Sequence, residues 1–146
     1  MKNYTAILIT LFMFLISTAY AGNHGGKGHF MEHMAHANPV PNYVSVIKKN
    51  TEALELTQEQ INQVMAWNKA NSTKMHEMVM SVIDGEIKMK QASLAGADAQ
   101  SILNTAKEVH ETRIKIIEGK TRCRDHIKSI LSDDQWKKLT LMIINK

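Results

Sequence analysis

The chain has 146 residues, and its 18 Lys and Arg against 14 Asp and Glu give a formal net charge of +4 at pH 7. Such a mild basic excess does not indicate a nucleic-acid-binding protein, so we expect no nucleic-acid partner. A single cysteine, Cys123, excludes an internal disulfide and therefore a small fold held together by disulfides. The thiol could pair between two chains, bind a metal ion or lie buried as a small hydrophobic group.

The first 21 residues have the pattern of a secretory signal peptide. Lys2 precedes a largely apolar run over residues 6–16, which is too short to span a bilayer as a helix. Ala19 and Ala21 then supply small residues at the two positions that a signal peptidase reads. We expect cleavage after Ala21, a periplasmic mature chain and no stable membrane insertion; the alternative is an uncleaved anchor.

Residues 22–42 are predicted to form a flexible tail rich in His, Gly and Met. Three of its histidines, at i, i+4 and i+7, could share one face of a helix, and imidazole is a natural ligand for zinc, copper and nickel. After cleavage, the new N-terminus would offer an amine, two amides and an imidazole in a square-planar site that suits Cu(II) and Ni(II). The expected metal ligands are Gly22, Asn23, His24, His29, His33 and His36. We expect Cu(II), Zn(II) or Ni(II) here and no organic cofactor; the alternative is a solubilising tail without a metal.

Residues 43–146 are predicted to form an all-α domain. Pro39 and Pro41 mark its border, no proline follows them, and no segment alternates with the period of a strand. The expected helices cover about residues 43–53, residues 57–91 with a possible bend near Asn71, a third helix that ends at Ile130, and a fourth after Ser132. The turn at residues 93–98 makes the two long helices an antiparallel hairpin with short flanking helices. Because such a hairpin has a thin core, we expect a homodimer or a shallow apolar face kept for a partner.

Residues at near-helical spacing, most of them apolar, mark one side of each long helix. On the second helix they are Ile61, Val64, Met65, Asn68, Met75, Met78, Val79, Val82, Ile83 and Ile87. On the third helix they are Ile102, Leu103, Ala106, Val109, Arg113, Ile114, Ile117, Cys123, Ile127 and Ile130.

Two short segments resemble each other and open two of the predicted helices. Leu56-Thr57 is followed by Gln60, and Leu131-Ser132 is followed by Gln135. A hydroxyl residue with glutamine three positions later is the sequence pattern of a capping box. The paired pattern resembles the LTxxQ-motif family of bacterial periplasmic proteins, which includes the Spy and CpxP stress chaperones, the zinc-resistance-associated protein and the CnrX-type metal sensors. The second copy has serine where the family has threonine.

The resemblance implies a curved helical hairpin that dimerises and that binds unfolded proteins, a periplasmic sensor domain or metal ions. The family members are not enzymes, so no catalytic residue is expected, and the six motif residues are expected to be structural markers. His29 and His33 resemble the H-x3-H pair of the CnrX-type sensors, for which later helices offer His76, His110 and His126.

We expect a Spy/CpxP-like, ATP-independent chaperone or envelope-stress adaptor. Its client surface is expected at Met75, Met78 and Met80, because flexible thioethers adapt to many apolar partners. For these methionines, copper ligation and core packing are the alternatives. The alternative function is a periplasmic heavy-metal buffer or sensor that uses the histidine-rich tail.

Overall fold

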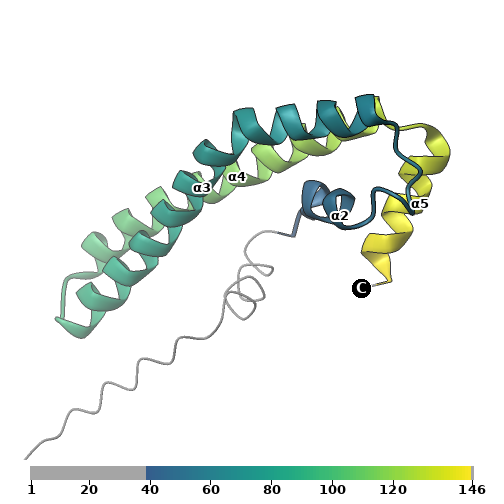
Figure 1. Ribbon diagram of the computed structural model, residues 1–146. Coiled ribbons are helices and arrows are strands. Elements are labelled where there is room, and N and C mark those ends of the chain that lie inside the picture. Colours follow the sequence, from purple (N-terminus) through teal and green to yellow (C-terminus); the bar gives the residue numbers. More distant parts are fainter. Residues whose placement is uncertain (1–38, 146) are drawn as a thin grey trace, which may run out of the picture.

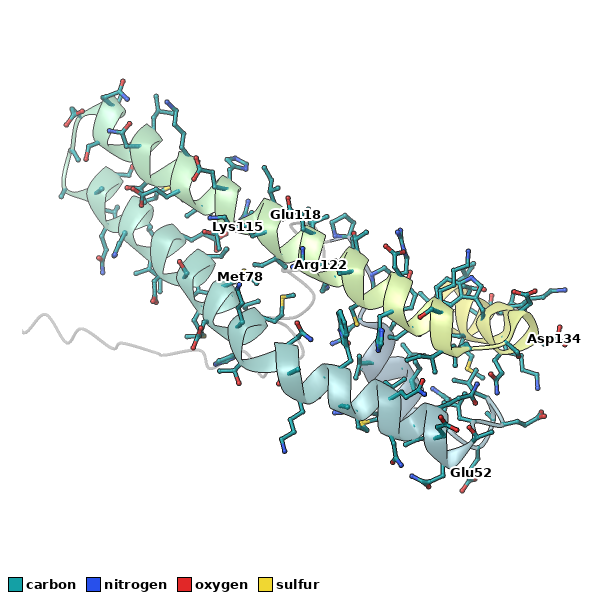
Figure 2. All side chains as sticks on the ribbon, turned by 90° about the horizontal axis from the view of Figure 1, so that it is seen from above. Glu52, Met78, Lys115, Glu118, Arg122 and Asp134 are labelled. Carbon is teal, nitrogen blue, oxygen red and sulfur yellow. The ribbon has the colours of Figure 1, made fainter. Side chains whose placement is uncertain are left out.

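A computed structural model describes residues 39–145, and this part of the chain is entirely α-helical, as predicted (Figure 1). The helices are α2 (Tyr43–Lys49), α3 (Gln58–Leu94), α4 (Ala99–Ile130) and α5 (Asp133–Ile144). The two long helices α3 and α4 lie side by side along their length as an antiparallel hairpin, with the short helices α2 and α5 at its open end (Figures 1 and 2).

The hairpin turn is a tight helix ending at Gly96, whose φ of 71° lies in the left-handed region that glycine favours. The amide of Ala97 donates to the carbonyl of Ala92, and the amide of Gly96 donates to that of Ser93. This pair of bonds is a Schellman motif. It places the end of α3 at Leu94, three residues later than the sequence prediction of Gln91, because Gly96 ends the helix and nothing before it does.

Helix α2 ends at Lys49, whereas the sequence prediction continued to about Ala53. Asn50 ends the helix: its amide donates to the Ile47 carbonyl and its side chain donates to the Val46 carbonyl. The following turns end at Glu55, which has a φ of 53°. The chain therefore reverses before α3 instead of extending α2.

The hairpin has two separate hydrophobic clusters. The base cluster, at the open end, joins all four helices and the preceding turn through Val44, Val46, Ile47, Leu54, Val64, Ile127, Leu131 and Leu139. The arm cluster, nearer the turn, consists of Val82, Val109 and Ile116, with Met75, Met78, Val79 and Met89 packed against it. Between them, every residue of α3 from Lys69 to Lys74 is exposed. Helix α3 is continuous through this stretch and follows the gentle curve of the hairpin (Figure 1).

Ile114 belongs to the spaced series on α4 but not to the buried side of that helix. Its side chain is 56% exposed, whereas Ile116, outside the series, is 1% exposed. Val109, Ile116 and Cys123 are spaced by seven residues and share the side that faces α3, and Ile114 is about half a helical turn away from that side. Leu103 and Ile87, which belong to the spaced series of α4 and α3, are 55% and 49% exposed.

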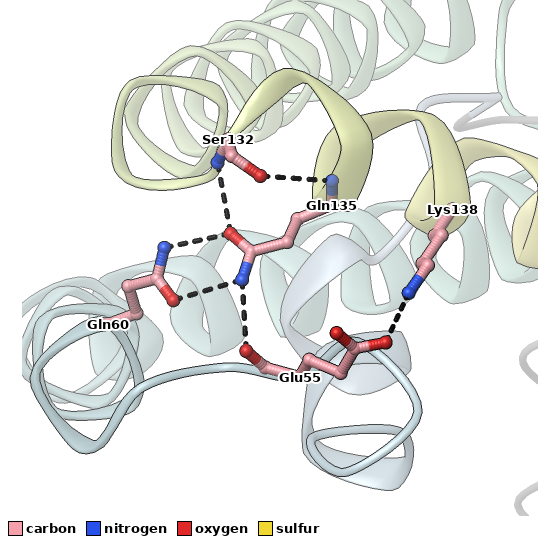
Figure 3. A network of polar contacts seen from close by, with 5 residues as sticks. All are labelled: Glu55, Gln60, Ser132, Gln135 and Lys138. Carbon is pink, nitrogen blue, oxygen red and sulfur yellow. Dashed lines mark hydrogen bonds and ion pairs between the residues drawn. The ribbon is translucent and has the colours of Figure 1, made fainter.

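Both predicted capping boxes are confirmed, at Thr57–Gln60 and Ser132–Gln135. Moreover, the two glutamines bond to each other (Figure 3). Gln60 Nε2 lies 2.8 Å from Gln135 Oε1, and Gln135 Nε2 lies 3.2 Å from Gln60 Oε1. The start of α3 is thereby tied to the start of α5, 75 residues later.

The bonds around this amide pair follow one rule on both sides. Each glutamine oxygen accepts from the amide of its own N-cap residue, and each glutamine nitrogen donates to the carbonyl two residues before the other N-cap residue. Those carbonyls belong to Ile130, at 3.0 Å, and Glu55, at 3.1 Å. The arrangement is a local pseudo-two-fold in which every hydrogen of both side-chain amides has an acceptor.

We predict that Gln60→Ala and Gln135→Ala will each lower the free energy of unfolding by about 1–3 kcal/mol, because partly buried carbonyls lose their donors. The double variant should lose less than the sum by about 0.5–3 kcal/mol, since the two residues share bonds. Denaturant unfolding monitored by circular dichroism measures all three. Gln58→Ala is the matched control, since Gln58 is exposed and bonds only to Asn62 within the same helix. Strict additivity would contradict the interlocked arrangement.

Two helical glycines allow a second prediction, because the same substitution meets different neighbours. A Cβ on Gly85 would overlap Cγ2 of Val109, whose χ1 is stiff in a helix. A Cβ on Gly119 would lie 2.8 Å from Cε of Met75, the end of a flexible side chain. We expect Gly85→Ala to destabilise by about 1–3 kcal/mol through overpacking. Gly119→Ala should be neutral or stabilise by up to about 1 kcal/mol through helix propensity. Thermal unfolding measures both, and equal effects would contradict the close contact at Gly85.

Candidate functional site

The arm of the hairpin has an apolar face that nothing covers within residues 39–145. We define this apolar face by Ile83, Ile87 and Leu94 of α3 and by Leu103, Ile114 and Ile117 of α4. Four of these side chains are about half exposed or more, up to 80% for Leu94. Ile83 and Ile117 flank the contact between the two helices, whereas Ile87 and Ile114 lie on the outer sides of their helices. Together these side chains leave much apolar surface of the arm uncovered.

An ion pair places two residues of the apolar face on the same side of the hairpin. Glu86 of α3 and Arg113 of α4 bond across the two helices. Ile83 lies three residues before Glu86, and Ile117 lies four residues after Arg113, so both share the side of the ion pair.

The same side carries the short helix α2. Lys120, seven residues after Arg113 and on the same side of α4, donates to the Val40 carbonyl at 2.7 Å. The chain then enters α2, which lies on the inner side of the curve of the hairpin (Figure 1). Ile83 and Ile117, beside the ion pair, are thus on the concave side of the molecule.

The opposite side of the arm is polar. A shallow depression there is lined by Glu77, Ser81, Asp84, Lys88, Thr105, Glu108 and Thr112, together with Met80 and other neighbours. The charges beside the apolar face are mixed. Glu118 and Arg122 line a shallow hollow together with Ile114 and Ile117. The arm therefore combines apolar side chains that have mixed-charge neighbours with a polar opposite face.

The three methionines predicted as a client surface have two different environments. Met75 and Met78 are half-buried and pack against the arm cluster. Met80 is 41% exposed and lies seven residues before Ile87, in line with it. Of the three, only Met80 is exposed, and it borders the polar depression.

The candidate metal ligands are not brought together. Gly22, Asn23, His24, His29, His33 and His36 lie outside the described residues. Within residues 39–145, no three His, Cys, Asp or Glu side chains are grouped as a metal site. His76 and His110 are exposed, whereas the His126 ring stacks on Trp67 with 4.2 Å between centroids.

A hollow of about 260 Å³ lies where α3 is exposed between the two hydrophobic clusters. Its lining comes from the segment around α2 (Pro41, Asn42, Tyr43 and Val44), from α3 (Trp67, Asn68, Asn71, Ser72, Met75 and His76) and from α4 (Gly119, Lys120 and Cys123). No acidic side chain is among them. Burial lowers the pKa of Lys120 and raises the pKa of the Cys123 thiol, although a hydrogen bond from Trp67 acts in the opposite direction on the thiol.

Sequence reasoning missed several residues of this region. Glu55 pairs with Lys138 at 2.5 Å, which lowers the pKa of its carboxyl group, first through the side-chain hydrogen bond and then through the opposite charge. Trp67 was not assigned to the apolar side of its helix. No sequence pattern around it identifies His126 of α4 as its stacking partner. Gly85 could have been noticed as an isolated glycine inside a helix, which often marks close approach of another backbone or side chain.

Comparisons of the chain with protein-family models, with curated proteins and with solved structures gave no match. Among the helices of residues 39–145, none combines the length and the hydropathy that crossing a membrane requires.

The raised pKa of Cys123 predicts slow alkylation of the folded protein. Because the thiolate is the reacting species, the pH midpoint of the iodoacetamide reaction should be higher for the folded chain than for the chain in denaturant. The rate at each pH, measured by mass spectrometry, provides both midpoints from the same single thiol. A folded midpoint at or below the unfolded one would show that Trp67 and Lys120 outweigh burial.

Proposed function

We propose that this protein is a periplasmic, ATP-independent chaperone or envelope-stress adaptor of the Spy/CpxP kind. It holds unfolded protein on the apolar face of its arm. The observation that supports this function best is the set of exposed apolar side chains along the arm, from Ile83 to Ile117. The paired capping boxes and the signal-peptide pattern support the family and the compartment.

The arm buries few apolar side chains in its interior and exposes more of them on its surface. Only Val82, Val109 and Ile116 are buried in the arm cluster, whereas six apolar residues form the exposed face. Burying a half-exposed isoleucine or leucine against a partner is worth on the order of 1 kcal/mol. Several such contacts give moderate affinity without a shape that selects one sequence, which is what a holding chaperone needs.

The charges around the apolar face do not favour clients of one charge. Glu118 and Arg122 both lie beside Ile114 and Ile117, and Glu86 and Arg113 neutralise each other in an ion pair. We therefore expect the apolar content of an unfolded segment, rather than its charge, to decide binding.

No side-chain arrangement in residues 39–145 argues for catalysis. The sequence contains no glycine-rich phosphate loop, so binding and release would proceed without nucleotide. The protein is proposed as a non-enzyme that acts through reversible apolar contacts.

The proposal is tested by placing a negative charge on each face of the arm. Ile87→Glu with Ile114→Glu alters the apolar face at half-exposed positions, and Ser81→Glu with Thr105→Glu is the matched control on the polar side. The first pair should weaken suppression of aggregation of a chemically unfolded test protein about tenfold or more, because a carboxylate would be buried against apolar groups. The second pair should leave suppression unchanged. Light scattering measures aggregation, and circular dichroism confirms that each variant is helical.

Two outcomes would contradict the client role. Unchanged suppression by the Ile87→Glu, Ile114→Glu variant would exclude the apolar face as the client site. Conversion of a dimer to a monomer by that variant, with suppression retained, would assign the face to contacts between copies of the chain. Deletion of residues 22–37 should leave suppression intact; loss of both metal binding and suppression on deletion would instead favour the alternative function, a metal buffer or sensor that uses the tail.

A further inference from the structure

We propose that the hollow between α3 and α4 is a binding site for a monovalent soft metal ion, Cu(I), held by the thiolate of Cys123, the thioether of Met75 and the imidazole of His76. This site lies in the helical domain and is separate from the metal ligands expected in the N-terminal tail. It does not depend on the proposed chaperone function.

The hollow exists because α3 supplies no apolar side chain larger than that of Ala70 between Trp67 and Met75. Residues 69–74 are all exposed, and Asn68, Asn71 and Ser72 stand where the interface would otherwise be filled. Asn71 turns its side-chain amide back to the Trp67 carbonyl, at 2.9 Å, rather than across to α4. The space of about 260 Å³ is much larger than a metal ion needs.

The two sulfur ligands point toward the same level of this hollow. Side chains in a helix lean toward the N-terminus of that helix, and α3 and α4 run in opposite directions. Met75 therefore leans along α3 toward the level of Cys123, and Cys123 leans along α4 toward the level of Met75. The Met75 methyl group already lies against Gly119, one turn before Cys123 and without a side chain of its own.

His76 supplies the third ligand at the rim. It follows Met75 directly, lines the same hollow and is exposed, so its ring can rotate toward the two sulfur atoms without leaving a packed position. A thiolate, a thioether and an imidazole together form a soft ligand set that suits Cu(I).

The charges in the hollow favour a monovalent ion over a divalent one. No acidic side chain lines it, and the Lys120 ammonium group is held at its edge by the Val40 carbonyl. When Cu(I) binds, it displaces the thiol proton of Cys123, which passes to the solvent, and the net charge of the site is unchanged. A divalent ion such as Zn(II) would leave one uncompensated positive charge beside Lys120 in a half-buried site.

The test uses the processed, full-length protein with the tail ligands His24, His29, His33 and His36 replaced by asparagine and Met31 and Met34 replaced by leucine. Anaerobic titration with Cu(I) against a chromophoric Cu(I) chelator should show one bound equivalent. Binding should release one proton in weakly buffered solution and should quench the fluorescence of Trp67, which lines the hollow. Zn(II) should bind at least about tenfold more weakly.

Variants of this background separate the site from adventitious sulfur binding. Cys123→Ser should abolish the bound equivalent and the proton release, and Met75→Leu, which preserves volume, should weaken binding about tenfold or more. Met80→Leu is the matched control, since Met80 is exposed and does not line the hollow. Equal Cu(I) binding by the Cys123→Ser variant, equal binding by the Met75→Leu variant, or preference for Zn(II) would overturn the proposal. Circular dichroism of each variant excludes unfolding as the cause of lost binding.

Discussion

The reciprocal amide pair of Gln60 and Gln135 is the interaction on which the arrangement of this fold depends. A glutamine in a capping box normally serves its own helix. Here each glutamine also completes the hydrogen bonding of the other, and each reaches a carbonyl just before the opposite helix. The starts of α3 and α5 are therefore placed relative to each other by directional bonds. The base cluster then packs between helices whose relative positions these bonds fix.

Because the open end of the hairpin stabilises the fold, the arm can leave apolar surface uncovered. Contacts among α2, α4 and α5 and the turn before α3 stabilise the open end, where Ile47, Leu54, Val64, Ile127 and Leu139 are completely buried. The arm adds the close contact of Gly85 with Val109 and the ion pair of Glu86 with Arg113. With the hairpin held at its base, the arm can expose isoleucine and leucine without loss of the fold.

The all-α class, the long antiparallel hairpin and both capping boxes could be predicted from the sequence, because they depend on local chemistry. No proline follows Pro41, and Gly96 provides the turn. Hydroxyl and glutamine residues recur at the spacing that capping boxes need. The bond between the two glutamines could not be predicted, since it depends on where α5 returns to α3. Nor could the burial of Ile116 in place of Ile114, because both are isoleucine and the register of α4 against α3 decides between them.

The candidate site was less predictable than the fold for a similar reason. Met75, Met78 and Met80 are close in sequence, but one turn of helix is enough to direct Met78 inward and Met80 outward. The hollow depends on a stretch of α3 that lacks apolar residues opposite a cysteine and a glycine of α4. That juxtaposition is a property of two helices together, and neither helix shows it alone.

The exposed stretch of α3 between the two clusters also divides the hairpin mechanically. Contacts on either side of residues 69–74 can be broken without breaking those on the other side, so the tip of the arm can open while the base stays closed. Backbone amides near Gly96 would then exchange with solvent deuterium through brief local unzipping, and those beside Ile127 only through global unfolding. The base of the hairpin is therefore expected to be more rigid than its tip.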